Sequence, residues 1–341
     1  MGNRVVSNKS VPEGLGCIIH NEDEMNDIHN DQIKFGSVYS KRGGKIVNQD
    51  SAVLCQGYGS TLDGVLCGVF DGHGEYGHVV SKAASRRLPL LLLNQKNAVL
   101  SSEVPTESQS SNCNGSSSLD KELVEWKTAF LNSFKEMDDE VMKMALKERY
   151  FTSGSTAVVA LKQGDDLLIA NLGDSRAILG TKGDNGVKAV LLTIDLTPRI
   201  PDEADRIRSF DGRVFALKNE PGVERAWMPR RNSPGMAMSR SFGDFFMKQC
   251  GIISTPVITH HHITSDDLFI LLATDGIWDV LSNEKVASIV WGVENEKMAS
   301  KAVVDAAVVE WKAKYSLDRP DDCTAVCYFL QKKVQTPSKP T

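Results

Sequence analysis

The stretch CGVFDGHGEYGHVV, residues 67–80, places an apolar run directly before an acidic residue, two glycines and a histidine. The apolar half has the composition of a buried strand, which is expected to end near Asp71. Asp and Gly are common turn residues, so a tight turn explains part of the pattern. A carboxylate at a strand end with His73 beside it also fits a metal ligand next to a proton-transfer residue. Both interpretations are open from this stretch alone.

The composition is that of a protein with a sizeable core. The chain has 341 residues, of which 41% are hydrophobic, which is compatible with one large mixed domain. The formal net charge is −5 and no basic stripe is present, so nucleic acid is not an expected partner. No apolar run approaches the roughly 20 residues of a membrane span, and no signal peptide is visible. These features favour a cytoplasmic or nuclear location.

The N-terminal sequence MGNRVVS resembles a myristoylation site but lacks the Ser or Thr that the pattern requires at position 6. Membrane attachment through an acylated N terminus is therefore not favoured. Seven cysteines are scattered along the chain, and the closest pair, Cys323 and Cys327, lies in a strand-like run. Free cysteine in an apolar context behaves as a small hydrophobic residue. We predict a reduced protein without a disulfide framework.

The chain is expected to consist of a loose N-terminal arm (1–33), a single domain (34–331) and a C-terminal tail (332–341). Residues 95–119 are rich in Ser, Asn and Gln and cannot bury enough apolar surface to offset their ordering entropy, so they are predicted to form a flexible loop. Residues 199–235 contain Pro and Gly throughout and are predicted to form a variable, flap-like section.

Several short apolar runs punctuated by Gly and Asp alternate with a few long helical patterns. The helices are predicted over residues 79–93, 120–149, 282–292 and 296–314. In the second of these, Trp126, Phe130 and Phe134 recur at helical spacing and are assigned to the core, with Asp120 as a plausible N-cap. Blocks of strands and helices favour an α+β fold of antiparallel sheets covered by helices over a regular βαβ repeat.

Acidic residues recur at the ends of the apolar runs. These residues are Asp50, Asp71, Asp174, Asp275 and Asp322, with Asp279 four residues after Asp275. A single Asp at a strand end is usually a turn residue, but five such sites suggest another purpose. If the strands are neighbours, the carboxylates gather and repel one another unless a cation neutralises them. An all-oxygen site favours Mg²⁺ or Mn²⁺, and two such ions can activate water and clamp phosphoryl oxygens.

Two other groups of residues receive a structural interpretation. The run HHH at 260–262 lies in a strand-like segment, where consecutive side chains point to alternate faces, so a shared metal site is not expected. Ser239 and Arg240 are expected to support the sheet or the site, because no base that would make Ser239 a nucleophile is evident.

Seven motifs together resemble the metal-dependent protein phosphatases of the type 2C family. They are NQD (48–50), VFDGHGEYG (69–77), SGSTAVVAL (153–161), NLGDSRAIL (171–179), MAMSRSFGD (236–244), LATDGIWDVLS (272–282) and RPDDCTAV (319–326). They occur in the order of the family across residues 34–330. The combination of NQD with TIDLTP and PDEADRI is most similar to the plant branch.

The resemblance implies a β-sandwich of two antiparallel sheets flanked by antiparallel helices, with two Mg²⁺ or Mn²⁺ ions at one end. By matching positions, Asp71 would bridge both ions and the Gly72 carbonyl would join it on one of them. Asp275 and Asp322 would complete the other, and Asp50 would act through metal-bound water. Asp174 and Asp279 match positions that hold a third, weaker metal in some members.

The implied activity is a protein serine/threonine phosphatase in which a metal-bridging water attacks phosphorus in line. His73 would be the general acid for the departing Ser or Thr oxygen. Implied partners are phosphoproteins of signalling, kinases among them, and a monomer is expected. The alternative is a catalytically inactive member that acts as a binding or scaffold protein. A two-metal nuclease would need a basic groove, which the negative net charge does not favour.

This sequence departs from the family pattern at two positions near Asp50. Gln49 stands where many members carry Glu, and Lys45 stands where members often carry a phosphate-binding Arg. Lys45 can still pair with phosphate, but as a point charge without the guanidinium fork. Asp195, in the segment DLTP, is assigned no chemistry and is interpreted as a turn residue.

Overall fold

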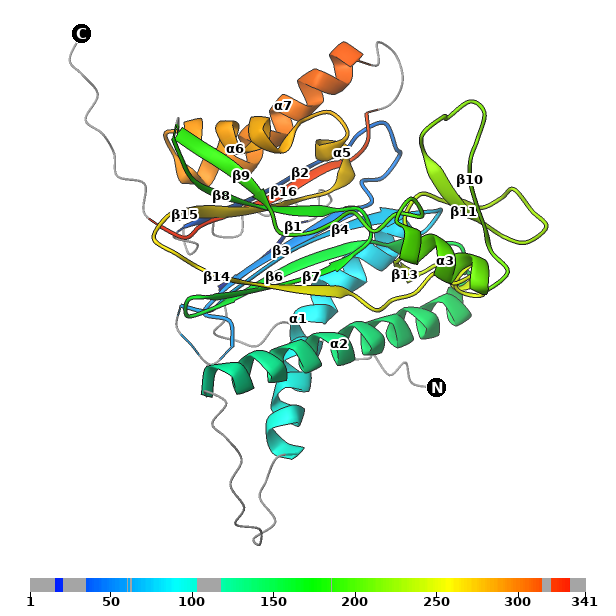
Figure 1. The fold of residues 1–341 in the computed structure, drawn as a ribbon, viewed down its shortest axis with the longest axis horizontal. Coiled ribbons are helices and arrows are strands. Elements are labelled where there is room, and N and C mark those ends of the chain that lie inside the picture. Colours follow the sequence, from blue (N-terminus) through cyan, green and yellow to red (C-terminus); the bar gives the residue numbers. More distant parts are fainter. Residues whose placement is uncertain are drawn as a thin grey trace, which may run out of the picture.

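Two stacked antiparallel sheets form the centre of the computed structural model, and helices pack on both outer faces (Figure 1). The structure describes residues 16–20, 35–59, 61, 63–102, 118–184, 186–314 and 320–331. The predicted α+β sandwich with helices on each side is therefore confirmed. None of the helices in these ranges is both long and apolar enough to cross a membrane.

The first sheet follows the order β1-β3-β4-β6-β7-β14, with the short strands β5 and β13 attached beside β4. Its strands are β1 (Gly16–His20), β3 (Asp50–Gln56), β4 (Val65–His73), β5 (Gly154–Ser155), β6 (Ala157–Gln163), β7 (Asp166–Leu172), β13 (Phe242–Gly243) and β14 (Val257–His262). The second sheet follows the order β2-β16-β15-β8-β9. Its strands are β2 (Gly36–Lys41), β8 (Arg176–Gly183), β9 (Gly186–Leu191), β15 (Asp267–Ala273) and β16 (Cys323–Phe329).

Helices cover the two sheets from opposite sides. The helices are α1 (Gly77–Ser102), α2 (Ser118–Glu148), α3 (Pro201–Ser209), α4 (Phe245–Lys248), α5 (Asp275–Trp278), α6 (Asn283–Gly292), the 3₁₀ helix η1 (Glu296–Met298) and α7 (Ala299–Lys314). Figure 1 shows α1 and α2 against the first sheet and α6 and α7 against the second. The sandwich therefore has apolar side chains on both faces of each sheet, which explains the nearly continuous apolar runs in the sequence.

The core has three main layers, and β4 contributes to two of them by simple alternation. Leu66 and Phe70 point toward α1 and α2, where they join Phe130 and Phe134. Their neighbours along the strand, such as Val69, lie between the two sheets. A third layer, which includes Phe269, Val303 and Phe329, packs between the second sheet and α6 and α7.

The two long helices differ from the predictions at their ends. The stripe on α2 is buried as predicted, but the helix begins at Ser118, so Asp120 lies in its first turn and is not the N-cap. Helix α1 continues to Ser102, so residues 95–102 are helical where a flexible loop was predicted. Contacts with α2 explain the extension, because the buried Lys96 pairs with Glu125 and lies over the ring of Trp126. Residues 103–117 of the predicted loop lie outside the described residues.

The prediction of a reduced chain with a loose arm over residues 1–33 is wrong at two points. Residues 16–20 form β1, which pairs with β3 at the edge of the first sheet. In this register Cys17 lies directly opposite Cys55, and the two form a disulfide. Pairing of strands far apart in sequence creates this proximity, so spacing along the chain could not reveal it. The tail 332–341 lies outside the described residues.

The section predicted to be flap-like has regular structure beside one end of the sandwich (Figure 1). It contains α3 and most of a small sheet of β10 (Arg213–Ala216), β11 (Glu224–Trp227) and β12 (Gly235–Met236). A separate small core holds it together, in which Ile207 of α3 and Ala226 of β11 are buried.

Candidate metal and phosphate site

Strand pairing gathers the predicted acidic residues at one end of the sandwich. Asp50 begins β3 and lies directly opposite Asp71 near the end of β4. Asp275 begins α5 just after β15 ends, and Asp322 directly precedes β16, which pairs with β15. Because antiparallel neighbours bring the end of one strand beside the start of the next, these carboxylates lie close together.

The strand-end carboxylates, defined here as Asp50, Asp71, Asp174 and Asp275, influence one another strongly. Burial and the charges of Asp275 and Asp50 raise the pKa of Asp71 well above its usual value. Burial and the charge of Asp322 raise the pKa of Asp50 to about 7. Burial and the charges of Asp174, Asp321 and Asp279 raise the pKa of Asp275. The protein's own groups therefore leave this cluster short of positive charge.

Unpaired oxygens within this cluster test whether a metal ion fits. Asp50 Oδ1, Asp174 Oδ1 and Asp275 Oδ1 are buried and have no hydrogen-bond partner among the described residues. Burying such an atom unpaired is costly, so a cation that binds it would remove a penalty. Purely oxygen donors suit Mg²⁺ or Mn²⁺. The donor set therefore fits a hard divalent cation.

Side chains alone do not complete such a site. Within the described ranges, no three His, Cys, Asp or Glu side chains are grouped so that they could hold one ion by themselves. Mg²⁺ in particular usually retains several waters and takes only one or two carboxylates, so carbonyl and water oxygens would have to contribute. The carbonyl predicted for this purpose is that of Gly72.

Two glycines allow the backbone segments of the site to approach closely. A Cβ at Gly72 would lie 2.4 Å from the carbonyl oxygen of Gly77 and 2.5 Å from that of Gln49. A Cβ at Gly276 would lie 2.0 Å from the carbonyl oxygen of Asp322. Any side chain at either position would push apart the segments that carry Asp71, Asp275 and Asp322.

Lys45 and Asp322 are fixed by the same loop. Asp322 accepts hydrogen bonds from the amides of Gly43 (2.8 Å) and Gln49 (2.9 Å). Lys45 Nζ lies 2.7 Å from Asp321 Oδ1 and 3.5 Å from Asp322 Oδ2. Burial would lower the pKa of Lys45, but the surrounding carboxylates raise it, so its charge is secure. Asp321 was not predicted, although the double aspartate of RPDD is its signal.

The side chain of Gln49, one of the two departures from the family pattern, holds the glycine loop. Its Nε2 donates to the carbonyl oxygen of Gly74 at 2.6 Å. The backbone carbonyl oxygen of Gln49 accepts from Ser81 Oγ of α1 at 2.5 Å. Gln49 thus connects the start of β3 to the turn after His73, a role that needs no charge.

His73 is bound to a carboxylate that the sequence analysis did not single out. Its Nε2 lies 2.6 Å from Asp244 Oδ2, and the same oxygen accepts from Ser241 Oγ at 2.7 Å. Burial would lower the pKa of His73, but Asp244 raises it above the usual value. Nδ1 is buried and has no partner within the described part of the chain. Asp244 ends the motif SFGD, which is the signal that could have identified it.

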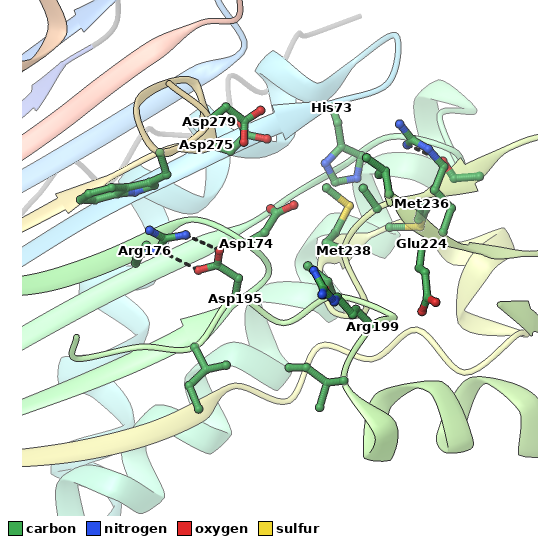
Figure 2. Close-up of a pocket in the computed structure, with 18 of the residues that line it drawn as sticks. His73, Asp174, Arg176, Asp195, Arg199, Glu224, Met236, Met238, Asp275 and Asp279 are labelled. Atoms are coloured by element: carbon green, nitrogen blue, oxygen red, sulfur yellow. Dashed lines mark hydrogen bonds and ion pairs between the residues drawn. The ribbon is translucent and has the colours of Figure 1, made fainter. Parts of the chain in front are cut away.

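A cavity of about 1190 Å³ opens beside these residues and is lined by His73, Asp174, Asp275 and Asp279, among others (Figure 2). Burial and the charges of Asp195 and Asp279 raise the pKa of Asp174 to about 6. Burial together with the charges of Asp321 and Asp195 raises the pKa of Asp279. The structure thus brings Asp174 and Asp279 to the same cavity as His73.

Asp195 is more than the turn residue that was predicted. Its Oδ1 and Oδ2 accept a two-pronged interaction from Arg176 Nε (3.0 Å) and Nη2 (2.6 Å), visible in Figure 2. Arg176 also donates to Asn283 and lies over the ring of Trp278, with 5.0 Å between the guanidinium carbon and the ring centroid. This group joins the start of β8 to α6 on one wall of the cavity. Arg176 lies 19 residues before Asp195, so local order along the chain does not reveal this pair.

The residues interpreted as structural do have structural partners. Arg240 and Ser239 both bind the carboxylate of Glu203 on α3. On β14, His260 and His262 reach Asp166, whereas His261 reaches Asp267 on the other side. The alternation expected of consecutive strand residues is therefore confirmed.

The sandwich and its strand-end carboxylates suit a metal-dependent hydrolase of phosphoric esters. The family model described as protein phosphatase 2C matches residues 49–311, and the chain belongs to that family. It is 49% identical over 304 residues to "Probable protein phosphatase 2C 72" of Arabidopsis thaliana, covering 89% of this chain and 87% of the relative. It is 48% identical over 321 residues to "Probable protein phosphatase 2C 12" of Oryza sativa subsp. japonica, covering 87% and 81%.

Solved structures agree on the fold. A serine-threonine phosphatase 2C from Toxoplasma gondii superimposes with a TM-score of 0.74 at 24% identity, covering 86% of this chain and 94% of that one. The predicted family and its plant-like branch are confirmed by the relatives. The chain is a metal-dependent protein serine/threonine phosphatase that acts on phosphoproteins, in a family that uses Mg²⁺ or Mn²⁺.

Proposed function

We propose that this phosphatase hydrolyses phosphoserine and phosphothreonine at the strand-end carboxylates, with two divalent ions per chain. Asp71 would bind both ions, joined by the carbonyl of Gly72 on one and by Asp275 and Asp322 on the other. Because these three carboxylates are not grouped around a single point in the described structure, binding of the second ion would have to draw them together. Asp50 would act through water. The observation that carries this proposal is the set of buried carboxylate oxygens that have no partner within the described residues.

The contacts of each aspartate support its proposed role. Asp71 lies within the influence of the charges of both Asp275 and Asp50, which supports a role for its carboxylate at two ions. Asp322 is oriented by two backbone amides, which fixes its free lone pairs before any ion arrives. When bound, the ions would supply activation of water and neutralisation of phosphoryl charge. Asp174 and Asp279, which line the cavity, are proposed for a third, weaker ion.

Lys45 is proposed to bind the phosphoryl group of the substrate. Its ammonium is paired with Asp321 and Asp322, and the charges of these carboxylates and of Asp71 raise its pKa and stabilise the charged form. An ammonium attracts phosphate as a point charge without imposing a bidentate geometry. Lys45 would therefore contribute more to affinity than to orientation of the phosphoryl group.

His73 is proposed to give its proton to the Ser or Thr oxygen as the phosphorus–oxygen bond breaks. An alkoxide is a poor leaving group, so a proton donor at this position lowers the barrier. Asp244 would hold the ring and favour its protonated form through the 2.6 Å contact with Nε2. Nδ1, which has no partner among the described residues, is the atom that we assign to proton transfer.

The proposal extends to the setting in which the enzyme acts. Signalling phosphoproteins, kinases among them, are the proposed substrates, and a monomer in the cytoplasm or nucleus is the proposed form. The relatives, all protein phosphatases, support a protein substrate. Gel filtration of the full chain and fractionation of cells that express it would check the oligomeric state and the location.

The decisive assay is hydrolysis of p-nitrophenyl phosphate by the full chain with and without EDTA. We expect no turnover in EDTA and recovery when Mn²⁺ or Mg²⁺ is added in excess. Turnover that is equal in both conditions would contradict the metal roles. Binding of Mn²⁺ without any hydrolysis would instead favour an inactive family member.

A further inference from the structure

A small apolar hollow adjoins the active-site cavity at one edge of the sandwich. Leu191, Ile194 and Val257 line it, and their exposed fractions are 55%, 73% and 37%. The hollow has a volume of about 240 Å³, several times the roughly 30 Å³ that one water occupies in the liquid. Large apolar side chains that are exposed together often mark a binding surface.

The walls of this hollow come from the edge strands of both sheets. Leu191 is the last residue of β9 and Val257 is the first residue of β14, and each strand lies at the edge of its sheet. A hydrogen bond from Thr259 Oγ1 to the carbonyl oxygen of Leu192, 2.9 Å long, joins the two edges. The hollow is therefore built on the ends of two edge strands and on residues 192–194, which directly follow β9.

The backbone at Ile194 is also fixed by a hydrogen bond from β7. Asn171, which is 2% exposed on β7, donates from Nδ2 to the carbonyl oxygen of Ile194 at 2.8 Å. Ile194 thus presents its side chain to solvent from a fixed backbone position. Because this backbone is already fixed, little backbone entropy is lost when a ligand covers the side chain.

The hollow is continuous with the active-site cavity. Leu191, Thr193 and Ile194 line both, and the cavity also contains His73 and Asp275. A polypeptide whose phosphorylated residue lies at the strand-end carboxylates can therefore continue into the hollow along one connected surface. This continuity identifies the occupant as part of the substrate chain.

We propose that the hollow is a docking pocket for one apolar side chain of the phosphoprotein substrate, aliphatic or aromatic, close in sequence to the phosphorylated residue. The proposal rests on the proposed function, because it places the phosphorylated residue at the strand-end carboxylates. Water released from the three exposed aliphatic side chains provides the driving force. Burial of one large apolar side chain corresponds to at least about tenfold in kcat/KM.

A series of phosphothreonine peptides would test this pocket. At each position that flanks the phosphothreonine, a peptide with Leu is compared with one that has Ser. With wild-type protein and Mn²⁺, we expect kcat/KM to be about tenfold higher for Leu at one flanking position. Ile194→Ser and Val257→Ser should each reduce that preference severalfold. Turnover of p-nitrophenyl phosphate, which has no flanking residues, should stay at the wild-type level in Val257→Ser, because Val257 lines the hollow but not the active-site cavity.

Val309→Ser is the matched control, because Val309 is 64% exposed on α7 and lines neither cavity. It should keep the full preference for Leu. The docking pocket would be overturned if the wild-type protein showed no preference for Leu at any flanking position. It would also be overturned if both pocket variants kept that preference. In either case, continued turnover of p-nitrophenyl phosphate would leave the proposed function intact. Self-association that is lost in Ile194→Ser would identify a second copy as the occupant and would also overturn it. Absence of turnover of either substrate by the wild-type protein would reject the proposed function itself.

Discussion

Two buried acidic groups in this molecule have opposite surroundings. On α3, Glu203 has a side chain that is 4% exposed, and it receives paired hydrogen bonds from Arg206 and Arg240 and a further one from Ser239. Although burial favours the neutral form, these donors lower the pKa of Glu203 to about 2. At the end of the sandwich, burial and mutual repulsion raise the pKa values of Asp50, Asp71 and Asp275.

The difference lies in where the compensating positive charge comes from. Two guanidinium groups within the chain neutralise Glu203, so this carboxylate serves the stability of the flap-like section and its junction with the sandwich. At the strand-end carboxylates, Lys45 is the one lysine whose charge lowers the pKa values of Asp50 and Asp71. Some carboxylate oxygens there have no hydrogen-bond partner within the described residues. A buried acid that the protein neutralises itself is structural, whereas one that it leaves uncompensated takes up either a proton or a cation from solution.

Asp71→Asn should have the largest effect on activity, because it disrupts the strand-end carboxylates. Loss of the charge that faces both Asp50 and Asp275 should abolish turnover of p-nitrophenyl phosphate at any Mn²⁺ concentration. Asp63→Asn, at an exposed carboxylate just before β4, is the control and should leave turnover unchanged. Substantial activity of Asp71→Asn at saturating Mn²⁺ would refute the ligand assignment.

His73→Ala should have the next largest effect, and that effect should depend on the leaving group. We expect a loss of about 100-fold in kcat with a phosphothreonine peptide. The loss should be much smaller with p-nitrophenyl phosphate, because nitrophenolate hardly needs a proton. His262→Ala, on the exposed face of β14, should change neither rate. Equal losses for the two substrates would contradict the general-acid role.

Glu203→Gln should lower the stability of the fold and leave the strand-end carboxylates unchanged. Removing one partner of a buried ion pair leaves Arg206 and Arg240 uncompensated, which should cost about 3 kcal/mol in the free energy of unfolding. Urea denaturation followed by circular dichroism would measure the change. Asp205→Asn, which removes an exposed ion pair with Arg208 on the same helix, should cost less than about 1 kcal/mol. Similar costs for the two variants would contradict the structural role.

The lowered pKa of Glu203 also predicts that the stability of the fold depends on pH. The pKa of Glu203 is lower in the folded state (about 2) than its ordinary value of 4.5, so its contribution is complete above pH 4.5 and declines as the pH falls toward 2. The difference in unfolding free energy between wild type and Glu203→Gln should therefore shrink by about 3 kcal/mol across this interval. A difference that stays constant down to pH 2 would show that ionisation of Glu203 does not stabilise the fold.

The sequence was sufficient for features that depend on local order along the chain. An apolar run followed by Asp-Gly located Asp71 and Asp275, because a strand end and the residue after it are adjacent in sequence. The stripe on α2 was predicted to be buried for the same reason, since helical periodicity can be counted directly.

Features that depend on distant pairings were missed. The disulfide of Cys17 with Cys55 requires the register of β1 on β3, which no composition rule supplies. Asp244 reaches His73 across 171 positions of sequence, and only its place in a quoted motif could have drawn attention to it. The long continuation of α1 depends on its contacts with α2, because tertiary packing there outweighs the polar composition of residues 95–102.

The hydrogen bonds of Asp322 connect the two ends of the folded domain. Its carboxylate holds the amides of Gly43 and Gln49, which lie 279 and 273 positions earlier, and the strand that follows it pairs with β2. A nascent chain on the ribosome therefore cannot assemble the centre until Asp322 and β16 have emerged. A product of premature termination before Asp322 lacks one of the carboxylates proposed as metal ligands, so we expect such a fragment to have no phosphatase activity.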